Sequence, residues 1–298
     1  MEHVAPPPRR PPADRLPGRS APRRGPVTHQ RYVRVAQDDG PRFGLVDDDA
    51  IVVIDPHPFA PHRPTGDRLP LEGLRLLAPV IPSKVVCVGR NYRAHADEMG
   101  GEVPDEPLYF LKPSSSIIGP GDPIRLPTDL AEEFHHEAEL AVVVGALLQR
   151  VDPDTAAAGI LGYTAANDVT ARDLQRRESQ WFRAKGFDSF CPLGPAIATG
   201  LDASNLAVRC LVDGELRQDG STADLVWDVP TLLSDVSQVV TLLPGDVVLT
   251  GTPAGVGPIA PGQTVRIEVE GVGVLDNPVV DRTADPGVVE RTDGHGNG

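Results

Sequence analysis

The second part of the chain contains a series of short apolar segments of strand length, and this series constrains the fold more than any other feature. Turns rich in glycine, proline and aspartate separate the segments; in "VDGELRQDG", Asp213-Gly214 is a two-residue hairpin signal. Helical periodicity is rare, and strict alternation of strands with helices is absent, which argues against a Rossmann fold. We therefore predict a mostly β fold with some α, built as a mixed-sheet sandwich or roll. The expected strands are residues 108–112, 137–145, 160–168, 206–212, 246–251 and 263–271.

Two segments have helical character. "VPTLLSDVSQVVTLL" (229–243) carries Pro230 near the first helical position and apolar residues at helical spacing. A shorter segment starts at Asn91, within "GRNYRAHADEMGG" (89–101), and is consistent with one or two helical turns. Because the segment ends in two glycines, it would be able to move as a hinged lid.

The distribution of residue types along the chain indicates several parts. The segment 31–54 alternates Val/Ile-rich runs with Asp-Gly-type turns, which is typical of a β-meander. Pro79 and Pro82 then mark a join between two domains. We predict a disordered Pro/Arg-rich extension (1–28), a small N-terminal β-domain (29–80), a larger domain (81–282) and a mobile tail (283–298).

Composition disfavours several classes of function. The formal net charge of −14 argues against nucleic acid as a partner, and no apolar run approaches the ~18 residues of a membrane span. The three cysteines (Cys87, Cys191 and Cys210) lack paired spacing, so we expect neither a disulfide framework nor a zinc ribbon. No secretory segment is recognisable in the sequence. We predict a cytoplasmic location, with no membrane or nucleic acid bound.

The segment "FHHEAELAVVVG" (134–145) places two glutamates at the mouth of an otherwise apolar strand. Side chains alternate between the faces of a strand, so Glu137 and Glu139 point the same way and repel each other. Asp168, at the end of "GYTAAND", adds a third acid. Converging carboxylates bind protons or surround a cation such as Mg²⁺, Mn²⁺ or Ca²⁺, which prefer oxygen ligands. A solvated strand end is the alternative, and the spacing alone does not decide between them.

The histidines beside this pair allow a second interpretation. By the same alternation, His135 shares the face of the two glutamates, so a His/Glu/Glu site for a transition metal is an alternative. A flanking histidine is more often a hydrogen-bond partner of a metal ligand than a ligand itself. We prefer this interpretation for both His135 and His136.

Two further groups have catalytic potential. His95 and Glu98 are three residues apart, so on a helix they share one face; a carboxylate that orients an imidazole is typical of a water-activating general base. An exposed surface pair is the alternative. Lys185, one of three lysines, lies among aromatic and glycine residues in "QWFRAKGFDSFCPLGP". It would neutralise an enolate or carboxylate beside a metal, unless it is a structural lysine with a buried stem.

Together, these stretches resemble the fumarylacetoacetate hydrolase family over roughly residues 84–280. The matching motifs occur in order: "VGRNYRAHADEMG", "PLYFLKPSSSIIGPGDPI", "HHEAELAVVVG", "GYTAANDVTARDLQ", "AKGFDSFCPLGP", "DGELRQDG" and "PGDVVLTGTPAGVG". Within the family, "CVGRNYRAHADEM", "HHEAEL" and "GELRQ" are most similar to the acylpyruvase and oxaloacetate decarboxylase branch. Residues 1–28 have no counterpart in the family.

The resemblance implies a mixed β-sandwich roll of the fumarylacetoacetate hydrolase type, with a catalytic domain at 81–282, that forms a homodimer. It implies that Mg²⁺ or Mn²⁺ binds, that His95 and Glu98 activate water on a closing lid, and that Lys185 is a cation near the enolate. The family's full-length hydrolase has a fourth, aspartate ligand, for which we find no equivalent. The remaining implied roles are metal ligation by Glu137, Glu139 and Asp168, and substrate contacts by Arg90, Gln175 and Thr252.

The predicted substrate is a small-molecule 2-oxo acid, and the predicted reaction is metal-dependent hydrolysis of a C–C bond in acylpyruvates such as fumarylpyruvate. Decarboxylation of oxaloacetate is a related reaction through the same enolate. The alternative is isomerisation of 2-hydroxyhepta-2,4-diene-1,7-dioate in aromatic catabolism. A catalytically silent binding homologue is disfavoured, because no proposed ligand or base is missing.

Overall fold

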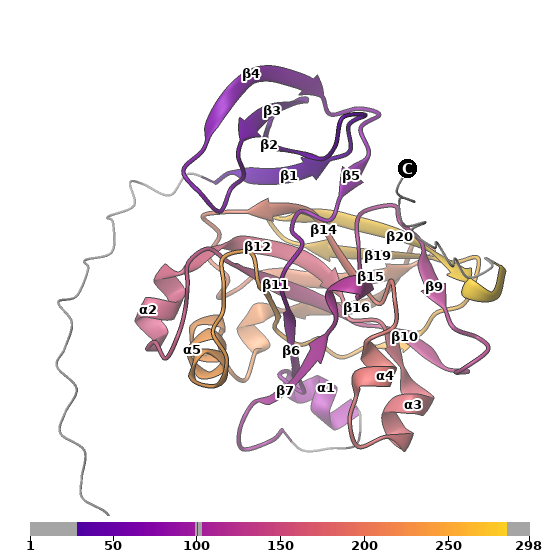
Figure 1. The fold of residues 1–298 in the computed structure, drawn as a ribbon. Helices are drawn as coiled ribbons and strands as arrows, with labels where there is room; N and C mark the ends of the chain where they lie inside the picture. Colours follow the sequence, from indigo (N-terminus) through magenta and orange to yellow (C-terminus); the bar gives the residue numbers. More distant parts are fainter. Residues whose placement is uncertain (1–28, 99, 101–102, 285–298) are drawn as a thin grey trace, which may run out of the picture.

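The structure is a computed structural model that describes residues 29–98, 100 and 103–284. The predicted extension at 1–28, residues 285–298 of the predicted tail and Gly101 of the predicted hinge lie outside the described residues. Strands dominate the described part, which confirms the prediction of a mostly β fold with some α (Figure 1). No helix in the described ranges combines the length and the apolar character that crossing a bilayer requires.

The largest element is a mixed sheet of 12 strands, with the order β4-β3-β2-β1-β14-β12-β11-β17-β6-β7. Two short strands extend it, since β5 pairs with β1 and β8 pairs with β14. Most neighbours are antiparallel, but β17 and β6 are parallel. The strands are β1 (Arg31–Val35), β2 (Arg42–Asp47), β3 (Ala50–Asp55), β4 (Arg63–Pro70), β5 (Leu76–Leu77), β6 (Val85–Gly89), β7 (Leu108–Lys112), β8 (Ile117–Ile118), β11 (Ala138–Val144), β12 (Ile160–Asn167), β14 (Cys191–Ala198) and β17 (Val247–Leu249).

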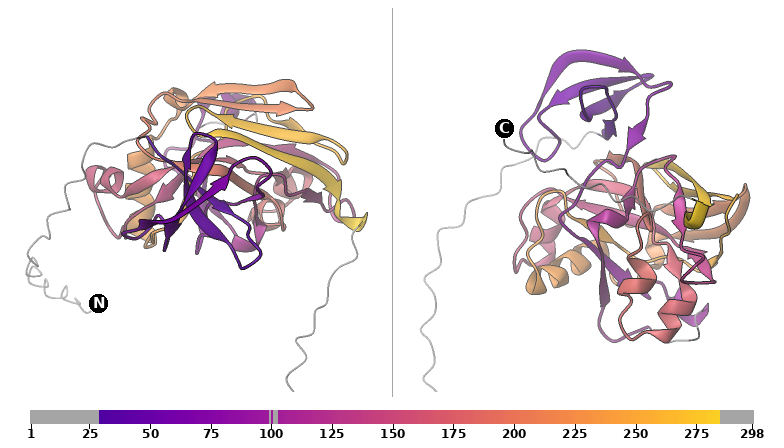
Figure 2. Two further views of the ribbon diagram at one scale, coloured as in Figure 1. Left: turned by 90° about the horizontal axis from the view of Figure 1, so that it is seen from above. Right: turned by 45° about the vertical axis from the view of Figure 1, so that its right-hand side comes forward.

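The first strands form a unit that lies on one side of the larger body, at the top of Figure 1 and of the right-hand view in Figure 2. β1, β2 and β3 are consecutive antiparallel neighbours, which is the meander that the Val/Ile alternation predicts. β1 also pairs with β14 through Tyr32 and Ile197, so the hydrogen bonding of the large sheet continues into this unit.

Two smaller sheets complete the β structure. A five-stranded sheet has the order β16-β15-β19-β20-β9, and a three-stranded sheet has the order β13-β10-β18. The predicted hairpin joins β15 to β16: Asp213 and Gly214 have φ values of 51° and 84°, as a type I′ turn requires. The strands are β9 (Ile124–Leu126), β10 (Phe134–His136), β13 (Thr170–Ala171), β15 (Ala207–Val212), β16 (Glu215–Ser221), β18 (Gly257–Pro258), β19 (Thr264–Val269) and β20 (Gly273–Asp281).

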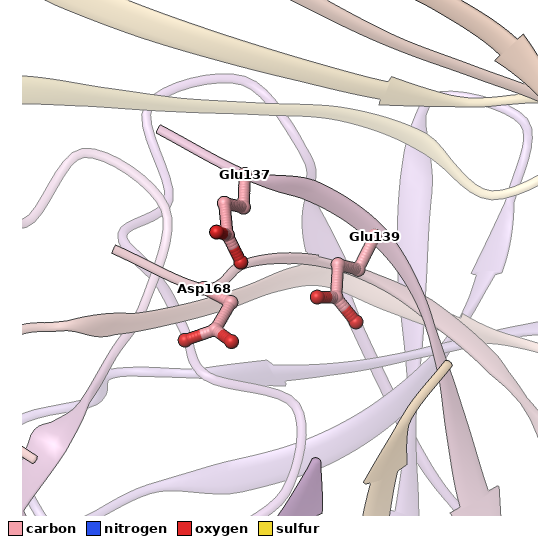
Figure 3. Close-up of side chains that lie close together, drawn as sticks. All are labelled: Glu137, Glu139 and Asp168. Atoms are coloured by element: carbon pink, nitrogen blue, oxygen red, sulfur yellow. The ribbon is translucent and has the colours of Figure 1, made fainter. Parts of the chain in front are cut away.

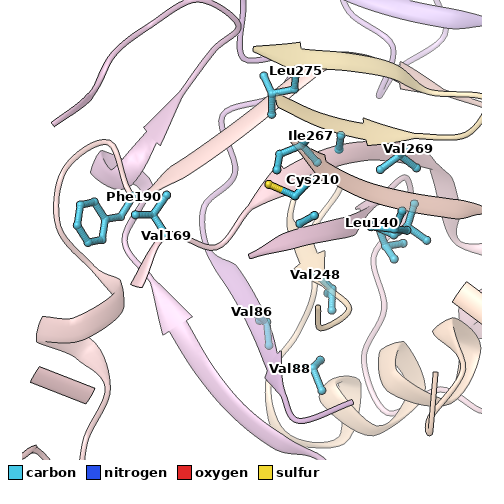
Figure 4. Packing of buried hydrophobic residues seen from close by; sticks show 14 of the residues in the cluster. Val86, Val88, Leu140, Val169, Phe190, Cys210, Val248, Ile267, Val269 and Leu275 are labelled. Carbon is cyan, nitrogen blue, oxygen red and sulfur yellow. The ribbon is translucent and has the colours of Figure 1, made fainter. Parts of the chain in front are cut away.

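The main hydrophobic core lies between the large sheet and the five-stranded sheet (Figure 4). Leu140 and Val248 contribute from the large sheet, and Cys210, Ile267 and Leu275 contribute from the other. Every residue of β11 is buried, so this strand is a rigid support for the residues at its start. All three cysteines are buried and free, as expected from their spacing.

Helices are short and lie at the periphery of the sheets (Figure 1). The longest is α5 (Val229–Val239). Asp228 caps its N-terminus, and the Asp228 side chain accepts a hydrogen bond from the backbone N–H of Thr231 at 2.9 Å. The predicted extent to residue 243 is wrong, because Leu242 leaves the helix to pair with Leu148 through two backbone hydrogen bonds of 2.9 Å. The others are α1 (Arg93–Glu98), α2 (Pro153–Ala158), α3 (Arg172–Arg177) and α4 (Phe182–Lys185), with 3₁₀ turns at Ser114–Ser116, Thr222–Asp224 and Arg282–Ala284.

Candidate active site

The three carboxylates identified in the sequence converge at one end of β11 (Figure 3). Glu137 precedes this strand, Glu139 is its second residue, and Asp168 follows β12. The antiparallel register pairs Ala138 with Asn167, and the backbone N–H of Asp168 donates to the Glu137 carbonyl at 2.9 Å. Each acid offers an oxygen within 4.8 Å of the others, and all three residues are at most 4% exposed. The solvated strand end is therefore not what the structure shows.

The environment of Glu139 disfavours its ionisation. Burial raises the pKa of this carboxyl well above its usual value, and the charges of Asp168 and Glu137 raise it further. The backbone N–H of Gly251 donates to Glu139 Oε2 at 2.7 Å. Gly251 has a φ of 99°, and a Cβ here would lie 2.8 Å from Asn91 Cβ, so the close approach of this backbone requires glycine.

Glu137 has the opposite electrostatic balance. Burial opposes its ionisation, but the charges of Lys185 and Arg172 outweigh burial and lower the pKa of the Glu137 carboxyl. Lys185 Nζ lies 2.8 Å from Glu137 Oε2, and Arg172 Nη2 lies 2.5 Å from Oε1. Lys185 Nζ also lies 2.7 Å from Asp168 Oδ2. The buried ammonium of Lys185 therefore bridges two of the three carboxylates.

The donor set of this site fits a divalent cation. Three carboxylates supply hard oxygen ligands of the type that Mg²⁺ and Mn²⁺ prefer. Asp168 Oδ1 is buried and accepts no hydrogen bond among the described residues, although the Lys112 ammonium lies 2.7 Å from it. Among the described residues, no fourth acid joins Glu137, Glu139 and Asp168 in this group.

Neither neighbouring histidine belongs to the acidic group in the described residues. His135 Nε2 lies 3.1 Å from Glu133 Oε1, away from the three carboxylates. His136 Nδ1 contacts Gln218 Oε1 at 3.0 Å, and burial lowers the pKa of His136 to about 4, so its imidazole is neutral near pH 7. Both histidines thus lie outside the acidic group, but among the described residues their side chains contact Glu133 and Gln218, and not a proposed ligand as the sequence interpretation expects.

A cavity of about 240 Å³ opens onto the carboxylates. Its walls include the acids and the predicted residues His95, Arg90, Gln175, Thr252 and Lys185. Glu98 is not among the described residues that line the cavity. It contacts His95, whose Nδ1 lies 3.3 Å from Glu98 Oε2. Burial lowers the pKa of His95, so its neutral form prevails near pH 7.

The three predicted substrate contacts occupy different parts of the wall. Gln175 Oε1 accepts a hydrogen bond from Arg172 Nη1 at 2.8 Å. The Thr252 hydroxyl donates to the Ala138 carbonyl at 2.8 Å, so it fixes the loop after β17 against β11. Arg90 lies in the left-handed region, with a φ of 58°. The structure thus brings all three to the cavity without testing their roles.

Sequence reasoning missed several residues that build this site. Arg172 contacts Glu137 from α3, and Phe110 and Trp181 form an aromatic wall with their ring centroids 5.4 Å apart. The Lys185 ammonium lies 5.0 Å from the centroid of the Phe110 ring. Buried Gln218 accepts hydrogen bonds from the backbone N–H of Ala138 and donates to Thr252. Arg172 and Gln218 lie inside motifs quoted above, but the local sequence does not set them apart from neighbouring polar residues.

Residues 84–280 match the family described as fumarylacetoacetate (FAA) hydrolase, C-terminal. The chain belongs to the fumarylacetoacetate hydrolase family. Residues 30–79 match a second family, described as Rv2993c-like, N-terminal. Members of the fumarylacetoacetate hydrolase family are enzymes, and in this member three acids, an imidazole and a buried lysine line one cavity.

Relatives within the fumarylacetoacetate hydrolase family carry the names of different reactions. The human mitochondrial oxaloacetate tautomerase FAHD2A is 45% identical over 225 residues, which are 71% of each chain. The crystal structure of 2-hydroxyhepta-2,4-diene-1,7-dioate isomerase from Mycobacterium marinum is 45% identical, with a TM-score of 0.79 over 85% of this chain and 99% of that one. Maleylpyruvate hydrolase from Sphingobium, solved with manganese(II) and pyruvate, is 33% identical, with a TM-score of 0.70 over 84% and 99% of the two chains.

Proposed function

We propose that this protein is a divalent-cation-dependent hydrolase that cleaves a C–C bond in acylpyruvate-type 2-oxo acids. The observation that carries the proposal is the position of His95: its imidazole lines the same cavity as the three carboxylates, with Glu98 behind it at 3.3 Å. A neutral imidazole oriented by a carboxylate is suited to activating water, which hydrolysis requires. The complex of the Sphingobium maleylpyruvate hydrolase with manganese(II) and pyruvate supports the same reaction class.

The proposed roles follow from the geometry. Glu137, Glu139 and Asp168 would hold Mg²⁺ or Mn²⁺, which supplies Lewis-acid polarisation to a bound 2-oxo acid. His95 Nδ1 faces Glu98, so the other ring nitrogen is left to take a proton from water. Lys185 offers a buried positive charge where negative charge develops on the substrate. Arg90, Gln175 and Thr252 remain the proposed substrate contacts on the cavity wall.

A second candidate function is isomerisation or tautomerisation of a 2-oxo acid through its enol. The names of the Mycobacterium marinum isomerase and the human oxaloacetate tautomerase favour it, at 45% identity each. In this reaction His95 would move a proton between carbon and solvent, and no water would attack. The cavity carries Arg90, Arg172, Arg176 and Lys185 beside its three acids, and these cations suit the carboxylate of either substrate.

One panel of assays tests the proposal. Purified protein with Mg²⁺ or Mn²⁺ is given acetylpyruvate and fumarylpyruvate, and pyruvate release is measured with a coupled dehydrogenase. In parallel, ultraviolet absorbance follows tautomerisation of oxaloacetate and of a hydroxymuconate-type diene. The proposal predicts pyruvate release that chelation abolishes. Tautomerisation without pyruvate release would overturn it in favour of the second candidate.

A further inference from the structure

Behind Asp168 lies a buried lysine that the proposed reaction does not use. Lys112 ends β7, and none of its side chain is exposed. Its Nζ donates to the carbonyls of Val169 at 3.1 Å and Phe190 at 2.8 Å, and also to the carbonyl of Lys185. The same nitrogen lies 2.7 Å from Asp168 Oδ1. Lys112 therefore contacts a proposed cation ligand, although it is not among the described residues that line the cavity.

The hydrogen bonding of Lys112 makes it a fixed charge. An ammonium has three N–H donors, and three backbone carbonyls accept from them. Asp168 Oδ1 is close to the ammonium but accepts no hydrogen bond from it. Among the described residues that line the cavity, Lys112 is absent, so it acts on a bound molecule through its charge and not through contact.

The buried side chains around the site carry equal numbers of negative and positive charges. Three anionic groups, Glu137, Glu139 and Asp168, face three cationic groups, Lys112, Lys185 and Arg172. Carboxylate ligands are ionised when they hold a metal, so with a divalent cation the buried set has a net charge of +2. Lys112 is one of these three buried cationic groups. It therefore opposes the binding of a cation and favours the binding of an anion.

We propose that Lys112 sets the balance between cation and anion affinity in this site: it weakens binding of the divalent cation and strengthens binding of a doubly charged substrate to the loaded site. The inference rests on the proposed function only in that the three carboxylates hold the cation. At an effective dielectric of about 20, a unit charge within roughly 7 Å changes the affinity for an ion by about tenfold or more. Loss of Lys112 should then shift the two affinities in opposite directions.

Calorimetry on the intact chain tests this inference without turnover. Mn²⁺ is titrated into wild-type protein, Lys112→Met and a matched control, Arg266→Met, which removes one positive charge from an exposed ion pair on the five-stranded sheet. Oxalate is then titrated into each Mn²⁺-loaded protein, and circular dichroism verifies folding. We expect Lys112→Met to bind Mn²⁺ roughly tenfold more tightly and oxalate roughly tenfold more weakly, while Arg266→Met matches wild type.

Each outcome decides the inference. If Lys112→Met weakens both Mn²⁺ and oxalate, the lysine is a structural support, and the inference is overturned. If the variant does not fold, Lys112→Gln, which keeps N–H donors for the carbonyls but removes the charge, is measured in its place by the same two titrations. Opposite shifts in the affinities for Mn²⁺ and oxalate support the inference, and unchanged affinities overturn it. Failure of the hydrolase proposal would leave these affinities unchanged, because none of them depends on catalysis.

Discussion

His95 Nδ1 lies 3.3 Å from Glu98 Oε2 within α1, and Glu98 in turn links this helix to a segment that is far away in sequence. The Glu98 carboxylate also accepts a hydrogen bond from the backbone N–H of Gly255, at 3.0 Å to Oε1. Helix α1 is thereby tied to the loop that follows β17. The same loop contains Gly251, which donates to Glu139, so the imidazole and the carboxylates share one support.

Substitution of His95 should separate catalysis from cation binding. We expect His95→Asn to lower kcat for pyruvate release by a factor of about 10²–10⁴, the usual contribution of a general base. Mn²⁺ affinity should be unchanged, because His95 is not one of the three carboxylate ligands. Steady-state kinetics and calorimetry measure the two effects. Equal losses of activity and Mn²⁺ affinity would show that His95 is structural.

The pH dependence should report the same imidazole. Burial lowers the pKa of His95 below its ordinary value of 6.5, although Glu137 and Glu98 oppose this shift. The base form is the neutral one, so kcat/KM should fall as the pH decreases through the lowered pKa, with the acid limb below pH 6.5. Glu98→Gln removes a charge that raises this pKa, and should move the limb to lower pH. An acid limb that stays in place in Glu98→Gln would contradict the assignment.

The carboxylates should control the requirement for a cation. Glu139→Gln keeps the shape of the side chain but removes an anionic ligand, so we expect at least a tenfold loss of Mn²⁺ affinity and loss of cation-dependent activity. Glu137→Ala should have the same effect on activity. The matched control is Glu133→Gln, which changes an exposed acid that pairs with Arg176 outside the group. Activity that survives exhaustive chelation in the wild-type protein would refute this prediction.

Much of the fold could be predicted from local patterns. The strand at 108–112 was predicted with the bounds that the structure has, and the hairpin turn follows from Asp213-Gly214. Glu137 and Glu139 lie close together, as the alternation argument predicts, whereas Asp168 joins them through the pairing of β11 with β12. Local patterns were sufficient here because each depends on side-chain alternation or on turn geometry within a few residues.

Residues that act across the fold could not be predicted in this way. Lys112 lies at the end of an apolar strand, and its importance depends on carbonyls at positions 169, 185 and 190. The role of Arg172, on α3, depends on Glu137, which precedes β11 and is remote in sequence. The early end of α5 depends on Leu148, which is remote in sequence and competes for the backbone of Leu242. Each of these contacts is long-range, so periodicity does not reveal it.

A buried carboxylate that is not among the described cavity residues connects two neighbouring strands of the large sheet. Asp246 follows the segment after α5, and its side chain is 1% exposed. Its Oδ1 accepts hydrogen bonds from the backbone N–H and the hydroxyl of Ser83, at 3.1 and 2.6 Å, and its Oδ2 accepts from the backbone N–H of Leu243 at 2.8 Å. Lys84 forms an ion pair with it. These bonds join the start of β6 to the start of β17, which are parallel neighbours in the large sheet.

Removal of this carboxylate should destabilise the protein in a pH-dependent way. Asp246→Ala removes the acceptor shared by Ser83, Lys84 and Leu243, so we expect the free energy of unfolding at pH 7 to fall by about 1–3 kcal/mol. Burial alone would raise the pKa of Asp246, but hydrogen bonds from Lys84 and Ser83 outweigh it and lower the pKa. The stabilisation is therefore present in full above the unfolded pKa of 3.8, and it is lost as the pH falls through the lower folded value.

Urea denaturation between pH 7 and the lowest pH at which the protein folds measures the difference in free energy of unfolding between Asp246→Ala and wild type. The control is Asp276→Ala at an exposed position, which should cost at most about 1 kcal/mol. A difference between Asp246→Ala and wild type that grows as the pH falls below 3.8 would contradict the assignment.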